Sequence, residues 1–199
     1  MTRQSVFLSA MSPALLGLLV VAQLTLLSSR ASAGPPLICH PIMIGNAKSL
    51  PSGDGPFGTK RDYDRTRLVE ETLALLTGEM PVLVRMETLR RASLYASGIY
   101  RGKSGWSNYS EEDRRIAYEL LARLMSRTLE AGGSDRSTSM RWFDVGYLMA
   151  CYEQTGLGKE FPGYSFVKKA LSFIGEDPEI EFACAIVTVW PKRYEHSQH

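Results

Sequence analysis

The sequence predicts an all-α protein of about six helices, stacked as antiparallel hairpins after a cleaved signal peptide and a loop-rich leader. Apolar residues recur at the three- and four-residue spacing of one helix face in successive segments. Glycine and proline separate these segments, and no two neighbouring segments alternate like paired strands. The connections are mostly short, which favours antiparallel neighbours.

The first 33 residues are typical of an export signal. Arg3 precedes an apolar run from Ala14 to Leu27, and the small residues Ala31 and Ala33 predict cleavage before Gly34. Because a spanning helix needs roughly 20 apolar residues, we expect no stable membrane insertion after cleavage. The protein is then exported, to the periplasm or the medium. An uncleaved anchor and a start at Met11 are the alternatives.

Removal of this signal divides the chain into a Gly/Pro-rich leader loop (34–63), an α-helical domain (64–191) and a C-terminal tail (192–199). The formal charge of the whole chain is +2, and Arg3 and Arg30 leave with the signal. The remaining chain is formally neutral, so we expect no nucleic-acid partner.

Two helices are expected first. Asp64 is placed to cap a helix that Gly78 ends, and Pro81 opens the next, where its missing N–H costs nothing. The inner face of this second helix carries apolar residues, which leaves other faces for its arginines. The inner residues are Val82, Met86, Leu89 and Ala96, and the arginines are Arg85, Arg90 and Arg91.

The third helix begins after a loop over 98–109. Ser110 and Asp113 resemble a capping box, followed by the clearest apolar stripe in the chain. The fourth helix runs through 140–154, and Gly156 fits its C-terminal cap.

Two further helices complete the domain. The fifth covers 164–174 and closes at Gly175. Asp177 followed by Pro178 is a strong start signal for the sixth, which Pro191 ends. Its β-branched residues over 184–190 also permit a strand, and the start signal favours the helix.

A short join occurs twice. "GEMP" at 78–81 recurs as "GEDP" at 175–178, each time between two helices. The separation of 97 residues is near three units of about 34 residues, the tetratricopeptide period.

The stretch from Trp142 to Pro178 resembles a lengthened tetratricopeptide repeat. Trp142, Val145 and Gly146 match the W-x-x-L-G opening, and Pro178 the closing proline. Ala170 and Leu171 resemble the late alanine. The stretch is several residues too long, and Met149 stands where a tyrosine is usual. The resemblance implies a helical scaffold that binds other proteins through a groove. The whole chain is also similar to exported bacterial helical proteins that carry no assigned function.

Cys39 and His40 are the candidate metal ligands, because sulfur and imidazole suit copper or zinc. A closed structural site needs about four ligands, and the other histidines, His196 and His199, lie in the tail. An apolar segment laid against the helices explains the same residues, so we expect no metal and no cofactor.

Cys151 and Cys184 are candidates for a disulfide, since exported proteins usually meet oxidising conditions. Both lie within apolar helical patterns. Buried, inert thiols are the equally weighted alternative.

Asp144 interrupts an apolar helix and shares a line with Tyr147. An ion pair with Arg141, three residues earlier, is the favoured interpretation. The functional alternative places Asp144, Tyr147 and Trp106, an aromatic of the central loop, on a surface that binds a partner.

The leading hypothesis is therefore an exported helical scaffold or interaction module whose partner is another protein. One alternative is an exported hydrolase with a pair of carboxylates between helices, for which no catalytic residue can be chosen. Another is a metal-binding protein using Cys39 and His40.

Overall fold

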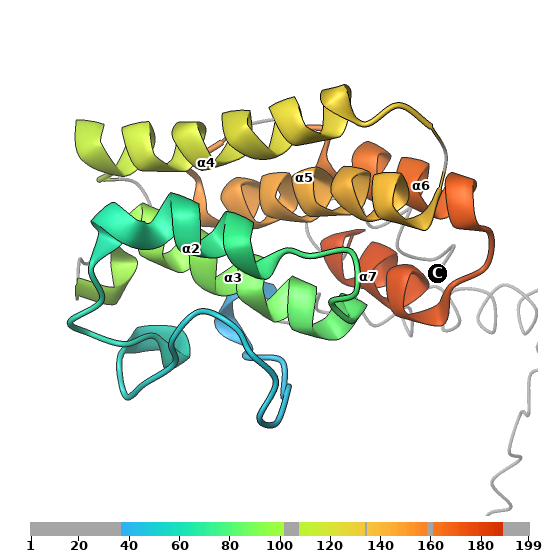
Figure 1. The fold of residues 1–199 in the computed structure, drawn as a ribbon. Helices are drawn as coiled ribbons and strands as arrows, with labels where there is room; N and C mark the ends of the chain where they lie inside the picture. The colour runs from blue at the N-terminus through green and yellow to red at the C-terminus, as the bar shows by residue number, and fades with distance from the viewer. Residues whose placement is uncertain (1–36, 102–107, 134, 159–160, 189–199) are drawn as a thin grey trace, which may run out of the picture. The chain divides into compact units, whose positions relative to one another are not determined.

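The computed structural model describes residues 37–101, 108–133, 135–158 and 161–188. The predicted signal peptide, Trp106, the end of the last helix near Pro191 and the predicted tail lie outside these ranges. The described residues form six α-helices and no strand, which confirms the all-α prediction (Figure 1). The helices are α2 (Leu68–Leu75), α3 (Val82–Ser97), α4 (Glu111–Glu130), α5 (Arg136–Thr155), α6 (Gly163–Ile174) and α7 (Pro178–Thr188).

Local capping signals set several helix ends. The Asp64 carboxylate accepts the Thr66 N–H at 3.0 Å and starts the 3₁₀ turn Arg65–Arg67 that leads into α2. Ser110 and Asp113 form the predicted capping box at the start of α4. Gly156 ends α5 in the left-handed conformation, with φ at 76°.

Helices α3 and α5 lie at the centre of the packing. α3 contacts α2, α4, α5 and α7, while α5 contacts α3, α4, α6 and α7. α3 is therefore enclosed on nearly all sides, and both Arg85 and Arg90 are buried. The expectation that α3 leaves faces other than the buried one for these two arginines is wrong, because α3 has almost no exposed face.

Helices α5 and α6 approach closely through Gly146 and Gly163. A Cβ built on Gly146 would lie 2.7 Å from the Gly163 carbonyl oxygen and 2.6 Å from the Val167 nitrogen. Such contacts are too short for a real Cβ, so glycine permits this spacing between the helices.

The two repeated joins meet in space. The Val82 N–H, directly after the first join, donates to the Glu179 carboxylate, directly after the second, at 3.2 Å. The carboxylate thereby pairs one of the free N–H groups at the start of α3. The two joins end up side by side although 97 residues separate Val82 from Glu179.

The described part of the leader, 37–63, contains no α-helix but packs against α3. Ile38 and Leu50 are buried in the core. The Tyr95 hydroxyl donates to the Pro51 carbonyl and accepts the Lys60 N–H, both at 2.8 Å. The leader therefore covers one side of the central helix (Figure 1).

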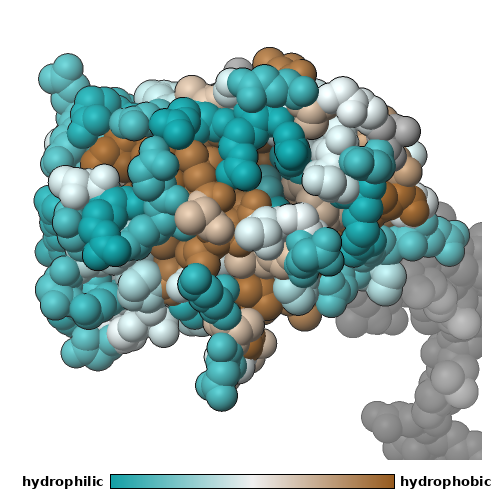
Figure 2. All heavy atoms as spheres, in the orientation of Figure 1, coloured by the Kyte–Doolittle hydropathy of each residue, from teal (hydrophilic) through white to brown (hydrophobic). Residues whose placement is uncertain are grey.

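Hydrophobic side chains reach the surface only in patches between hydrophilic ones on the face drawn in Figure 2. The large hydrophobic residues that are exposed in the described ranges are Met43, Tyr118, Leu129 and Phe182. Within those ranges no helix has the length and apolar character to cross a bilayer.

Candidate functional site

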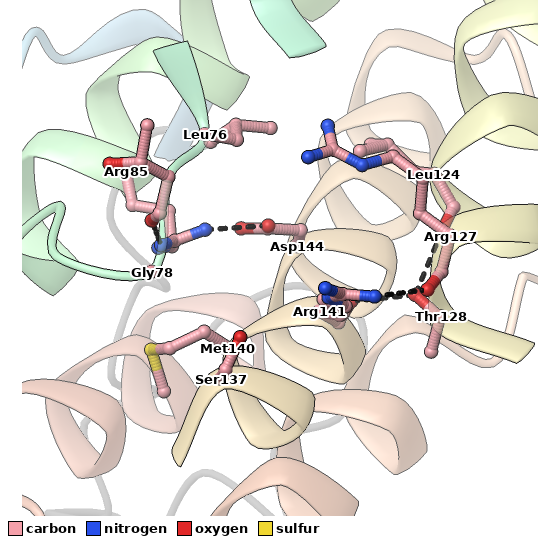
Figure 3. Close-up of a pocket in the computed structure, with 11 residues that line it drawn as sticks. Leu76, Gly78, Arg85, Leu124, Arg127, Thr128, Ser137, Met140, Arg141 and Asp144 are labelled. Atoms are coloured by element: carbon pink, nitrogen blue, oxygen red, sulfur yellow. Dashed lines mark hydrogen bonds and ion pairs between the residues drawn. The ribbon is translucent and has the colours of Figure 1, made fainter. Parts of the chain in front are cut away.

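A cavity of about 70 Å³ lies where the α2–α3 turn meets α3, α4 and α5 (Figure 3). The Gly78 turn closes one side and α4 and α5 form the opposite side. Its lining combines four charged side chains with small and apolar ones. The lining residues are Leu76, Thr77, Gly78, Arg85, Leu124, Arg127, Thr128, Ser137, Met140, Arg141 and Asp144.

Arg85 from α3 and Asp144 from α5 form a buried ion pair at this cavity. The Arg85 Nη1 to Asp144 Oδ2 distance is 2.6 Å, and the two side chains are 1% and 4% exposed. Arg85 Nη2 also donates to the Thr77 carbonyl, which ties the α2–α3 turn to the pair. The partner of Asp144 is therefore Arg85, and the ion pair predicted with Arg141 is not the direct one.

Two polar atoms of this pair have no hydrogen-bond partner among the described residues: Nε of Arg85 and Oδ1 of Asp144. Buried polar groups are nearly always paired with protein or with another molecule. Leaving such an atom unpaired costs about 1–3 kcal/mol. The pair therefore carries two unpaired polar atoms that are buried beside the cavity.

Two further guanidinium groups line the cavity from α4 and α5. Arg127 Nη1 donates to the Leu73 carbonyl at 2.9 Å, and Arg141 Nη1 donates to the Arg127 carbonyl at 2.8 Å. A guanidinium has five N–H donors, so most of the donors of Arg127 and Arg141 stay unused by the described residues. Figure 3 shows the Arg127 side chain extending from α4 toward the side of the cavity that holds Asp144, and the Arg141 guanidinium beside Thr128, bonded to the Arg127 carbonyl.

The electrostatic balance of the cavity is positive, because three guanidinium groups surround one carboxylate. Burial raises the pKa of Asp144 to about 6, against the lowering effect of Arg85, Arg127 and Arg141. At neutral pH the carboxylate is mostly ionised, and an excess of two positive charges remains. Such a site is suited to an anion.

A second buried ionic cluster holds the leader in place. Glu87 on α3 accepts from Arg90 at 2.7 and 2.8 Å, from Arg91 at 2.6 Å and from the Ile42 N–H at 2.9 Å. Arg90 also donates to the Ile38 carbonyl at 2.8 Å.

Burial would raise the pKa of Glu87, but Arg90, the Ile42 N–H and Arg91 together hold it below its usual value. The carboxylate is therefore ionised and its hydrogen bonds are made within the fold. This cluster anchors the leader to α3, and its groups are already engaged with one another.

The predicted metal ligands do not form a cluster in the structure. Cys39 is half-buried and ends the 3₁₀ turn Leu37–Cys39 of the leader, and His40, the next residue, is exposed. Burial raises the pKa of the Cys39 thiol, and the nearby Arg90 offsets this only in part. No group of three metal-binding side chains occurs in the part of the chain that the structure describes.

Cys151 and Cys184 are both buried and both free thiols. The disulfide considered between them is not formed in this structure. Burial raises the pKa of each thiol to about 12, so both stay protonated at neutral pH. Their environment corresponds to the alternative of inert core thiols.

Of the predicted partner-binding residues, the structure places Asp144 at the cavity and Tyr147 elsewhere. Tyr147 is buried and stacks on Phe143 with ring centroids 5.6 Å apart. It does not line the cavity, and Trp106 lies outside the described residues. The interacting set around Asp144 consists instead of arginines.

Local sequence patterns did not identify Arg85, Arg127 and Arg141 as cavity residues. Arg85 gave a signal, because it lies three residues after Val82 and four before Leu89, on the apolar side of α3. Arg127 gave no such signal, since an arginine near a helix end is ordinary on the surface.

Comparisons of the chain with protein-family models, with curated proteins and with solved structures found no match.

Proposed function

We propose that this chain is an exported helical binding module and that its cavity receives an anionic group of a partner. Export rests on the pattern of the first 33 residues. The observation that carries the binding role is the convergence of Arg85, Arg127 and Arg141 on a small cavity with unused N–H donors.

Guanidinium groups bind carboxylate and phosphate oxygens through pairs of parallel hydrogen bonds. Inside a cavity these bonds are strengthened, since the local dielectric is lower than that of water. Arg127 and Arg141 are half-buried, so their donors are accessible from the cavity and held by the helices. This arrangement favours recognition of an anionic group over general attraction to a charged surface.

The same cavity favours binding over hydrolysis by two carboxylates. That chemistry needs a second carboxyl group within roughly 5–10 Å of the first. Among the described residues that line the cavity, Asp144 alone carries a carboxylate. Arg85 already holds one of its oxygens at 2.6 Å.

Thermal unfolding of the purified protein in acetate and in chloride, at equal ionic strength, tests this proposal. We expect acetate to raise Tm, because a ligand at ten times its Kd stabilises a protein by about 1.4 kcal/mol. The double variant Arg127→Gln/Arg141→Gln is expected to lose this rise.

Arg123→Gln is the matched control. Arg123 lies one turn before Arg127 on α4, its side chain is 52% exposed, and it pairs with Glu70 at 3.3 Å. We expect this variant to keep the acetate effect. Equal Tm values in acetate and chloride, or an equal acetate effect in the double variant, would contradict the proposal.

A further inference from the structure

Asp144 is a titratable group in the wall of the cavity, surrounded by groups that keep their charge. Those that face it are Arg85 from α3, Arg127 from α4 and Arg141 on its own helix, α5. The described lining also includes uncharged residues of the α2–α3 turn, and no residue of α6 or α7. A proton on Asp144 therefore raises the net charge of the described lining from two positive charges to three.

The contacts of Asp144 favour its protonated form more than those of an exposed carboxylate would. Its Oδ2 lies 2.6 Å from Arg85 Nη1, but its Oδ1 is buried and has no hydrogen-bond partner among the described residues. Burial of a charged oxygen without a partner disfavours the ionised state. This desolvation raises the pKa of Asp144 to about 6, so the carboxyl group changes its charge between neutral and mildly acidic conditions.

Protonation of Asp144 also changes the electrostatic environment of Arg85. Ionised Asp144 is the counter-charge of this guanidinium, whose side chain is 1% exposed. Neutral Asp144 leaves Arg85 as a buried charge without compensation, which is unfavourable inside a fold. An anion in the cavity supplies a negative charge beside the same three guanidinium groups. The anion and the charge of Asp144 therefore compete for the same positive partners.

We propose that the cavity is a pH-controlled anion site, in which protonation of Asp144 strengthens anion binding and ionised Asp144 weakens it. This inference rests on the proposed function and adds the regulation of that site. Because the two binding events are linked, an anion that prefers the protonated form also promotes proton uptake by Asp144. The protein therefore holds its anion more tightly in an acidic medium than at neutral pH.

Isothermal titration with nitrate tests this inference. Nitrate stays ionised at pH 5, and it offers the planar pair of oxygens that a guanidinium binds. The unaltered protein is titrated at pH 7.5 and at pH 5, at equal ionic strength. Two unit charges roughly 8 Å apart, at an effective dielectric constant of about 20, alter a binding constant by more than about tenfold. We expect nitrate to bind about tenfold more tightly at pH 5 than at pH 7.5.

Asp144→Asn is the matched variant, since its side chain has nearly the size of the original and cannot ionise. We expect its nitrate affinity to be the same at both pH values and close to that of the unaltered protein at pH 5. A second measurement needs no variant. Titration of the unaltered protein at pH 6.5, in two buffers of different ionisation enthalpy, measures the protons taken up on binding. We expect uptake of a substantial fraction of one proton.

The outcomes separate this inference from the proposed function. Equal nitrate affinities at pH 5 and pH 7.5, or no proton uptake at pH 6.5, would overturn the inference and leave the anion-binding function standing. The same pH dependence in Asp144→Asn would overturn it too, because another group would then be responsible. If nitrate binds at neither pH, the proposed function fails and the inference fails with it.

Discussion

Arg85 and Asp144 are 59 residues apart in the chain, and they meet in the core at 2.6 Å. The contact joins the two central helices, α3 and α5, and through Thr77 it also fixes the α2–α3 turn. It therefore combines a structural role with a place in the wall of the cavity.

Removing one member of this pair should lower the free energy of unfolding much more than replacing both members with apolar residues. We expect Asp144→Ala to lower the free energy of unfolding by about 3–5 kcal/mol, because Arg85 is left as an uncompensated buried charge. The double variant Arg85→Met/Asp144→Leu should recover much of the loss. Urea unfolding of Asp144→Ala, of the single variants Arg85→Met and Asp144→Leu, and of the double variant measures this. Additive losses in the double variant would show that the two side chains do not act as a pair.

The pKa of Asp144 makes stability depend on pH. Its pKa rises from 3.8 to about 6 on folding, so the folded state binds the proton more tightly than the unfolded state. The shift adds to the free energy of unfolding, and this contribution of Asp144 is fully present below about pH 4 and is lost as the pH rises through 6. It amounts to about 3 kcal/mol.

The measurement is the difference in unfolding free energy between the unaltered protein and Asp144→Asn, followed from pH 4 to 7. The difference removes the contributions of other groups, such as Glu87, whose pKa is lowered. We expect the advantage of the unaltered protein to fall steadily across this range. A constant difference would mean that Asp144 titrates as it does in the unfolded chain.

Any side chain at position 146 should destabilise the protein. Gly146→Ala places a Cβ within 2.7 Å of α6, so the helices must separate, and we expect a loss of about 1–3 kcal/mol. Gly132→Ala is the control, since a Cβ there meets nothing within 4 Å. Thermal unfolding compares the two. Similar Tm values would show that α5 and α6 can part without cost.

The three thiols should react at different rates. Cys39 is half-buried, whereas Cys151 and Cys184 are buried with pKa values raised to about 12. We expect a maleimide to label Cys39 first in the native protein and the other two only after denaturation. Failure of both to react in denaturant without a reductant would reveal a disulfide between them.

The sequence predicted best what depends on neighbouring residues. Asp64 and the Ser110–Asp113 capping box act within three residues, and the structure confirms both. The six helices follow in the same way from apolar spacing and from glycine and proline at their ends.

The site depends on contacts between distant residues, which local patterns do not specify. Asp144 drew attention as a charge within an apolar helix, but its nearest arginine in sequence, Arg141, is not its direct partner. For Arg85 the sequence predicted that a face other than the apolar one was available. Only the packing of α3 on α2, α4, α5 and α7 shows that almost no other face is exposed.

Nuclear magnetic resonance of the arginine side chains during an acetate titration tests the anion site most directly. The account predicts that the Nε–H signals of Arg127 and Arg141 shift along one saturable curve, while that of the exposed Arg123 stays near its starting position. Signals of Arg127 and Arg141 that do not move, or that move only in proportion to those of surface arginines, would contradict it.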